Sequence, residues 1–184
     1  DFHWHRRIYG NGDGVYGEIS NGRGDFACVH ISSPRVVRQY HGGADGTEVR
    51  WILLGGMLLE IGKSASNGSV KRCALIFPAS GKELWAKELG GGLLFYASDH
   101  RTICLYHTPE RGESICYRFH RPRLRMSFDR EKVLVPNISG AECAVCHGLF
   151  LLILRGQMWV FDRELNYLGY KEVTTKLTKT DREE

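Results

Sequence analysis

Two-residue turn signals recur along the whole chain and leave little room for elements longer than a strand. Pairs such as Asn-Gly and Asp-Gly favour tight β-turns, because these residues tolerate positive φ angles. The segments between them are short and rich in Val, Ile, Leu, Tyr, Phe and Trp, which strands favour. The signals are Asn11-Gly12, Asp13-Gly14, Asn21-Gly22, Gly42-Gly43, Asp45-Gly46, Gly55-Gly56, Asn67-Gly68, Ser80-Gly81 and Gly90-Gly91-Gly92. This feature predicts an all-β chain of antiparallel hairpins.

The turns divide the chain into a series of expected strands. These lie near residues 14–20, 25–31, 35–40, 47–54, 57–62, 70–77, 84–89, 93–97, 102–107, 114–120, 124–128, 132–135, 142–146, 149–154, 157–161 and 167–173. Residues 82–89 also match a helical pattern, so a helix and a bulged strand both stay open there. Residues 162–168 are expected to form a turn. The polar residues 174–184 have no apolar face and are expected to form a disordered tail.

Composition narrows the class of partner. The chain has 184 residues, 42% hydrophobic and 25% charged, which is ordinary for one soluble globular domain or two similar subdomains. Its longest apolar run, residues 149–154, is far shorter than the ~20 residues of a membrane helix. The net charge is +4, and the one dense basic run is Arg118, Arg121, Arg123 and Arg125 with His120. Such a run is more typical of a solvated edge than of a nucleic-acid site, so we expect neither a membrane nor a nucleic acid as partner.

The cysteines indicate a reducing compartment. There are six, at positions 28, 73, 104, 116, 143 and 146, and the first four lie inside apolar strand-like runs. Free cysteine behaves there as a small buried hydrophobe. The first residues carry no secretory signal pattern, so we expect reduced thiols and an intracellular protein. In that setting Arg23-Gly24-Asp25 is interpreted as the end of a hairpin turn and not as an adhesion motif.

No motif for catalysis or for a cofactor is complete. Cys143-Ala144-Val145-Cys146-His147 has the spacing of a c-type haem attachment site. The same residues could form half of a zinc site, but such a site would need a second pair of ligands, which the sequence does not signal. We interpret it as a buried strand with two small thiols, and predict no metal and no cofactor. Neither a nucleophile elbow nor a phosphate-binding glycine loop is present, and the acidic residues lie mostly at turns. The sequence therefore predicts a protein that is not an enzyme.

Two segments resemble polo boxes. Trp4 and the glycine-rich residues 10–14 precede VYGEISNGRGDFACVHISSPRVVRQY, residues 15–40, as a tryptophan and a turn precede the first strands of that family. LLFYASDHRTICLYHTPERGESICYRF, residues 93–119, is similar to a second box. Divergent polo boxes of this kind occur in the C-terminal region of kinetoplastid kinetochore kinases. The resemblance implies two tandem units, each closed by a helix, with a peptide groove between them.

The polo-box resemblance also implies site residues. His100 stands where the family has a phosphate-binding histidine, while Thr102 replaces the family's lysine and Arg101 lies one step away. Binding of a phosphorylated peptide is therefore not expected to follow from the fold alone. We expect Trp4, His100 and Arg101 to line the groove, since a tryptophan can form its apolar floor and the two other side chains can bind phosphate or carboxylate.

A β-propeller is the rival resemblance. GLFLLILRGQMWVFDRELNYLGY, residues 148–170, looks like the inner strands of a blade, and SGKELWAKEL, residues 80–89, is similar to quinoprotein-type repeats. Four blades of roughly 45 residues would fill the chain. The predicted fold is thus mainly β, with antiparallel hairpin-rich sheets in two polo-box-like units, or else a small or partial β-propeller.

Both folds serve as interaction platforms, and the functional prediction follows from that. We expect a non-enzymatic protein–protein interaction module that binds another protein or a peptide, either as a divergent polo-box domain recruiting a kinetochore or scaffold partner or as a propeller scaffold of a larger complex. The kinetochore resemblance adds the nucleus as a location. The expected division is a first β unit at 1–69, a second at 70–173 and a disordered tail at 174–184.

Overall fold

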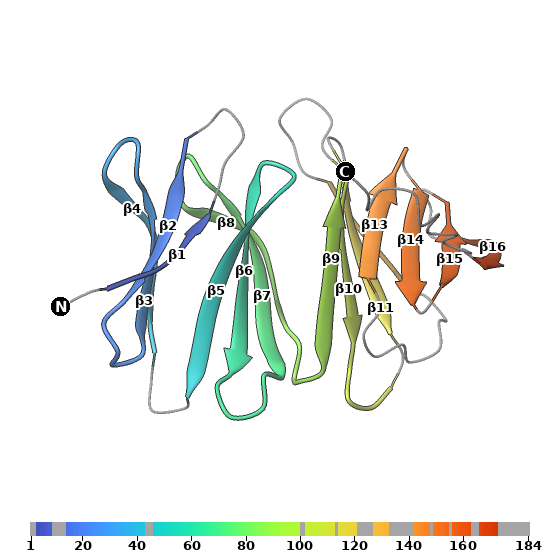
Figure 1. Cartoon of the computed structure of the whole chain (residues 1–184), viewed down its shortest axis with the longest axis horizontal. Coiled ribbons are helices and arrows are strands. Elements are labelled where there is room, and N and C mark those ends of the chain that lie inside the picture. The colour runs from blue at the N-terminus through green and yellow to red at the C-terminus, as the bar shows by residue number, and fades with distance from the viewer. Residues whose placement is uncertain are drawn as a thin grey trace, which may run out of the picture.

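The chain folds into successive antiparallel meanders, each of which forms one sheet (Figure 1). In this computed structural model the described residues are 3–8, 14–42, 46–99, 102–112, 114–120, 127–132, 142–147, 149–154, 156–162 and 166–172. The first two sheets contain β1 (His3–Ile8), β2 (Tyr16–Ser20), β3 (Asp25–His30) and β4 (Arg35–His41), then β5 (Thr47–Leu54), β6 (Met57–Ser64), β7 (Val70–Phe77) and β8 (Lys82–Glu88). The other two contain β9 (Leu93–Ser98), β10 (Thr102–Thr108), β11 (Ile115–His120) and β12 (Ser127–Lys132), then β13 (Glu142–Cys146), β14 (Leu149–Leu154), β15 (Gln157–Phe161) and β16 (Tyr167–Glu172).

Two of the signalled turns that lie within the described residues show how the strands are joined. Between β2 and β3, the side-chain oxygen of Asn21 accepts hydrogen bonds from the backbone N–H groups of Arg23 and Asp25, at 2.9 and 3.2 Å. Gly22 and Gly24 have positive φ angles in this turn, so the Arg-Gly-Asp tripeptide does fill a hairpin end. Gly55 and Gly56 likewise join β5 to β6 as an antiparallel pair, as predicted.

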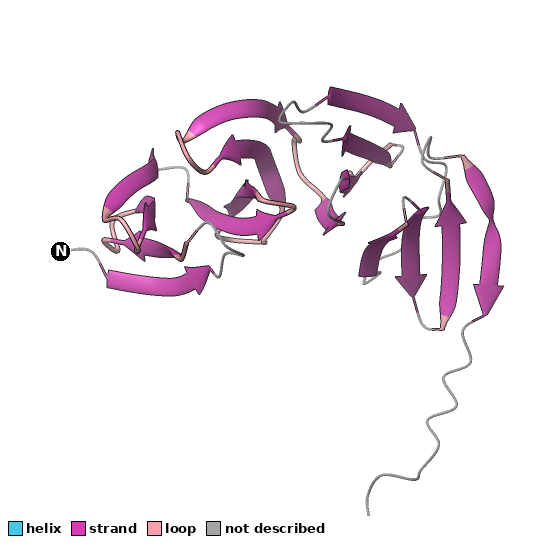
Figure 2. Ribbon diagram, turned by 90° about the horizontal axis from the view of Figure 1, so that it is seen from above, coloured by secondary structure: helices cyan, strands magenta, loops and turns pink. Residues whose placement is uncertain are grey.

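The four sheets stand side by side along an open arc (Figure 2). Each follows the order of the chain, from its first strand to its fourth, and every neighbouring pair within a sheet is antiparallel. The first strands of neighbouring sheets approach one another: β1 lies against β5, and β9 lies against β13. Four-stranded meanders arranged radially in this way are the blades of a β-propeller.

Apolar side chains fill each joint between neighbouring sheets. The central strands β6 and β10 are buried on both faces, because each lies between two other sheets. The joint of the first and second sheets contains Tyr16, Phe26, Cys28, Val37, Val49, Trp51, Leu58, Ala74 and Ile76. That of the second and third contains Leu54, Met57, Leu59, Ile61, Val70, Cys73, Leu75, Ile103, Leu105, Tyr117 and Phe119. That of the third and fourth contains Cys104, Tyr106, Cys116, Phe150, Leu152 and Phe161.

The predicted all-β class is confirmed. One open alternative is resolved, one strand was missed, and one expected break is wrong. Residues 82–88 form a strand, β8, and not a helix, because Trp85 packs against the third sheet, with its ring centroid 5.0 Å from that of Phe119. Strand β1 was not expected, since its sequence HWHRRI is too polar to indicate one. The predicted break around Asp129 is wrong. That residue lies inside β12 and pairs with Arg118 of β11.

The sheet order favours the propeller resemblance over the polo-box one. A polo box closes its sheet with a helix, and the described residues contain only strands, turns and bends. The boundary expected at 69/70 falls between β6 and β7, which pair within the second sheet. Division into units at that point stays a prediction, and residues 174–184 lie outside the described residues.

Candidate functional site

A buried polar network joins the first sheet to the second. Its centre is Glu60 on β6, which is only 4% exposed. One carboxylate oxygen accepts a hydrogen bond from the indole Nε1 of Trp51 at 2.8 Å and from Arg38 Nε of β4 at 3.1 Å. The other accepts from Arg72 Nη1 of β7 at 3.0 Å. Because Trp51 is fully buried, its indole N–H would have no water as an alternative partner.

A second carboxylate extends this network to the surface. Glu83 of β8 accepts hydrogen bonds from Arg72 at 2.7 Å and from Arg38 at 2.9 Å. Partial burial acts to raise the pKa of Glu83, but the hydrogen bonds and charges of Arg72 and Arg38 outweigh it and hold that pKa below its usual range. For Arg38 the hydrogen bond to Glu60 raises the pKa. The two guanidinium groups are thus engaged by glutamates, and we interpret the network as a structural tie between sheets.

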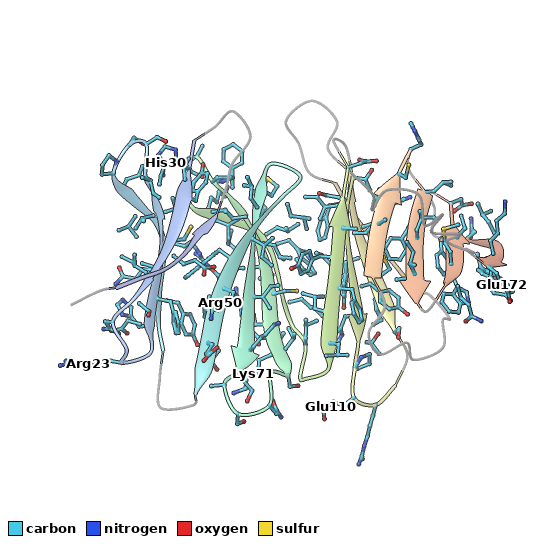
Figure 3. The ribbon with its side chains drawn as sticks, viewed as in Figure 1. Arg23, His30, Arg50, Lys71, Glu110 and Glu172 are labelled. Atoms are coloured by element: carbon cyan, nitrogen blue, oxygen red, sulfur yellow. The ribbon has the colours of Figure 1, made fainter. Side chains whose placement is uncertain are left out.

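Glu18 makes a further tie across the same joint. Its carboxylate accepts a hydrogen bond from the backbone N–H of Trp51 at 2.6 Å and pairs with Arg50 at 3.5 Å. Figure 3 shows Arg50 on β5, close to the first sheet. Because Glu18 is 2% exposed, this carboxylate serves the packing of β2 on β5 and does not face solvent.

The loops of the second and third sheets are tied by another set of polar contacts. Nε2 of the buried His107 lies 2.7 Å from the carbonyl oxygen of Gly91. Ser69 Oγ donates to Glu110 at 3.2 Å and accepts from the N–H of Gly92 at 2.9 Å. Burial lowers the pKa of His107, and the bond to Gly91 opposes that effect only in part. A neutral imidazole in this position suits a structural role.

The outermost strand of the fourth sheet exposes a group of large apolar side chains. Tyr167 and Leu168 are each 58% exposed and Tyr170 is 48% exposed. We call these three residues the β16 surface. The two tyrosine rings rest on inner residues of the same sheet, with ring centroids 5.7 Å apart for Phe161 and Tyr167 and 6.3 Å apart for Trp159 and Tyr170. Figure 3 locates this strand by Glu172, at the end of the arc opposite the N-terminus.

The other outermost strands with described side chains are less apolar at their surface. Strand β4 exposes one large apolar side chain, Val36, and β8 exposes one, Leu84. Three large apolar residues within four positions therefore distinguish β16. The sequence predicted a strand here but did not single these residues out, although a Tyr-Leu-Gly-Tyr run beside a polar tail could have signalled an exposed edge.

The three residues expected to bind a partner belong to different parts of the fold. Trp4 lies in β1, with its Cα opposite Ile19 of β2, and its side chain is outside the described residues. His100 and Arg101 are also outside them. The ends of β9 and β10 that flank them are joined by Asp99, whose carboxylate accepts from the N–H of Thr102 at 2.7 Å. Strand β1 belongs to the first sheet, whereas β9 and β10 belong to the third, with the second sheet between (Figure 1). A joint role in binding stays a prediction.

Most described cysteines are buried free thiols. Cys28, Cys73, Cys104 and Cys116 are buried. Cys146 is exposed, so the expectation that its strand is buried is wrong at this position. Burial, reinforced by the charges of Glu18 and Glu60, raises the pKa of Cys28 to about 12, and burial also raises that of Cys73 to about 12. Among the described side chains, no group of three or more His, Cys, Asp or Glu residues could hold a metal ion. The expectations of no metal and no cofactor stay predictions.

The structure describes only part of the basic run. Arg118 of the basic run lies on β11, while Arg121, Arg123 and Arg125 are outside the described residues. Within the described ranges, no helix has the length and apolarity needed to cross a membrane.

Solved structures with a similar arrangement include propeller proteins of very different sequence. BamB from Moraxella catarrhalis shares 13% identity with a TM-score of 0.51, and the match covers 88% of this chain and 51% of BamB. The WD40 domain of Pan2 from Neurospora crassa shares 7% identity with a TM-score of 0.49, covering 86% of this chain and 49% of that one. The β-propeller domain of Cps50 (Swd1) from Myceliophteria thermophila shares 11% identity with a TM-score of 0.49, covering 94% and 59%.

These likenesses concern the fold alone. No protein-family model matches the chain, and no curated protein matches it in sequence. The chain spans about half the length of the first two solved structures.

Proposed function

We propose that the chain is a protein–protein interaction module of β-propeller type that binds its partner through the β16 surface. The observation that carries this proposal is the exposure of Tyr167, Leu168 and Tyr170 on one outermost strand. Aromatic residues supply much of the energy at protein interfaces, because they bury a large area and lose few rotamers. Clustered exposed apolar side chains of this kind mark interaction sites more often than isolated ones do.

The position of β16 supports an extended partner segment. Among the described strands it pairs with β15 alone, so one row of its backbone groups faces away from its sheet. A partner strand can add to such an edge through main-chain hydrogen bonds. Val160 pairs with Gly169 and Phe161 with Tyr167, so Leu168 is the extra residue of a bulge on β16. We expect the partner to lie along Gly169–Glu172 and to cover Leu168 with an apolar side chain.

The proposal carries over the expectation of a non-enzymatic, intracellular protein. The non-enzymatic part is supported by the described polar clusters, which hold sheets together: Glu60 and Glu83 bind arginines, and His107 contacts a backbone carbonyl. A narrower version, in which the chain recruits a kinetochore partner as a polo-box-like domain in the nucleus, rests on the sequence resemblance of residues 15–40 and 93–119.

Affinity capture with matched variants tests the proposal. The whole chain is used as bait in three forms: wild type, Leu168→Asp, and Leu84→Asp as a control at another exposed leucine of an outermost strand (43% exposed). Quantitative mass spectrometry should find proteins that the wild type and the control retain and that Leu168→Asp loses by about tenfold or more. Circular dichroism checks that each variant folds. Equal retention by all three baits would exclude the β16 surface.

A photo-crosslinking amino acid distinguishes a partner that contacts β16 directly from one whose binding is lost indirectly. Placed at Tyr170, it should crosslink to the same protein that Leu168→Asp loses. Placed at Leu84, it should not. A crosslink from Leu84 and none from Tyr170 would move the binding site to the second sheet.

A further inference from the structure

The fourth sheet has one apolar face that no other described sheet covers. Phe150 and Leu152 of β14 and Phe161 of β15 point to the third sheet and are buried there. The alternate residues therefore point the other way, since side chains of a strand alternate between faces. We define the outward face of the fourth sheet as Leu149, Leu151, Ile153, Met158 and Val160, all of which are only half-buried.

The same positions of the second sheet show what such a face is suited to contact. There Leu59 pairs with Leu75 and Ile61 with Cys73, just as Leu151 pairs with Val160 and Ile153 with Met158. The four residues of the second sheet are at most 2% exposed, because they pack on the third sheet. The outward face of the fourth sheet repeats this apolar pattern, so its natural occupant is the face of another antiparallel sheet.

The other end of the arc offers such a face. Cys28 and Phe26 of β3 point to the second sheet, so Ala27 and Val29 point away from it. Ile19 pairs with Ala27 and Val29 pairs with Val36 on this side. We define the outward face of the first sheet as Ile19, Ala27, Val29 and Val36. All four are apolar, but only Val36 is strongly exposed, at 56%, and Ala27 is 3% exposed. The exposed Gln39 of β4 pairs with Ala27 on the same side.

The geometry points to a second copy of this chain as the occupant of both faces. The first and fourth sheets form the two ends of one arc (Figure 2), and each outward face lies on the side opposite to its neighbouring sheet. In a head-to-tail pair, the first sheet of each copy covers the fourth sheet of the other. Two such contacts close a ring of eight sheets, whereas contacts that do not close would build a filament. The match to BamB covers 51% of that chain, so a second copy would supply the equivalent of its remaining half. This pairing is independent of the β16 surface.

The pairing is tested by measuring the molar mass in solution of the wild type and of two variants, one in each outward face. Sedimentation velocity and light scattering of the wild type should give twice the 20.9 kDa of one chain. Val160→Glu in the fourth sheet and Val29→Lys in the first should each yield monomers, with dimerisation weakened by about 100-fold, since each buries an unpaired charge in both contacts. Leu84→Asp, on the second sheet, should remain dimeric. Circular dichroism and urea unfolding confirm that both variants fold.

Mixing the two variants distinguishes head-to-tail pairing from other arrangements. In a mixed pair one contact contains both substitutions and the other contains neither, so dimers should reappear. Pairing between two fourth sheets would instead leave Val29→Lys dimeric, and that result would overturn the proposal. A wild type that stays monomeric up to about 100 μM, or that forms a polydisperse series of larger species, would overturn it as well.

Discussion

Glu60, on the central strand β6, accepts hydrogen bonds from side chains of three other strands. Trp51 belongs to β5, Arg38 to β4 and Arg72 to β7, and each places a donor within 3.3 Å of the carboxylate. A charge removed from water costs free energy unless it is paired in this way. One residue therefore couples the first sheet to the second.

Replacing Glu60 with alanine should lower the free energy of unfolding by about 3 kcal/mol, because the indole N–H and two guanidinium groups lose their acceptor. Urea denaturation followed by tryptophan fluorescence measures the change. Glu88→Gln is the control, since Glu88 also pairs with Arg72 but its side chain is 79% exposed. That variant should differ from wild type by less than about 0.5 kcal/mol. Equal losses in both variants would contradict the role of burial.

His107 should make the protein less stable in mild acid. Burial holds its pKa below the ordinary value of 6.5 in the folded state, so its contribution to stability is complete above about pH 6.5 and is lost as the pH falls through the lowered pKa. We therefore expect the stability difference between wild type and His107→Gln to shrink between pH 7.5 and pH 5. Urea midpoints of both proteins at the two pH values measure it. An unchanged difference would show that His107 does not titrate on unfolding.

At the scale of elements, the turn between β7 and β8 shows how closely one hairpin approaches another sheet. Gly81 has φ +70°, and a Cβ atom there would lie 2.1 Å from the carbonyl oxygen of Val37 on β4. Gly68, between β6 and β7, has φ +69° with nothing within 4 Å of the same position. The two glycines have the same backbone conformation and differ in what surrounds them.

Alanine at these two glycines should separate backbone strain from contact between elements. Both variants bear the cost of a left-handed residue, about 1–2 kcal/mol. Gly81→Ala should lose a further ~1–3 kcal/mol, because the turn must move away from β4. Thermal and urea unfolding give the two values. Similar losses at both sites would indicate that β4 moves aside easily.

At the scale of the whole molecule, stability resides in the joints between sheets. Leu105 of β10 is fully buried in the joint of the second and third sheets, beside Tyr117 and Phe119. Trp85 of β8 reaches the same joint from the opposite side. Neither sheet could keep these side chains from water without the other, so we expect the two sheets to unfold together.

Leu105→Ala should lower the free energy of unfolding by about 2–5 kcal/mol, as large-to-small changes in a core do. Leu93→Ala on the neighbouring strand β9 should cost under about 1 kcal/mol, since Leu93 is 42% exposed. Urea unfolding is followed by both far-UV circular dichroism and tryptophan fluorescence. Coincident transitions are expected in all three proteins, and separate transitions for the two probes would contradict joint unfolding.

Much of the fold could be predicted from the sequence, because it depends on neighbours along the chain. Asn21-Gly22 and Gly55-Gly56 form turns with backbone angles that few other residues tolerate, and the apolar runs around them can only extend as strands. Strand β1 is the exception among the elements. Its polar sequence carries no local signal, and pairing with β2 holds it in the sheet.

Local sequence patterns account for the local geometry: the strands, the hairpins and the absence of a long apolar segment. Tertiary packing sets the number and order of sheets, the burial of Glu60 among arginines from two sheets, and the exposure of Tyr167, Leu168 and Tyr170 on an edge. It also decided that Leu59 is covered while Leu151, in the equivalent position, is only half-buried. The physical reason is that an apolar face looks the same in the sequence whether or not another sheet packs on it, and that packing depends on residues far away along the chain.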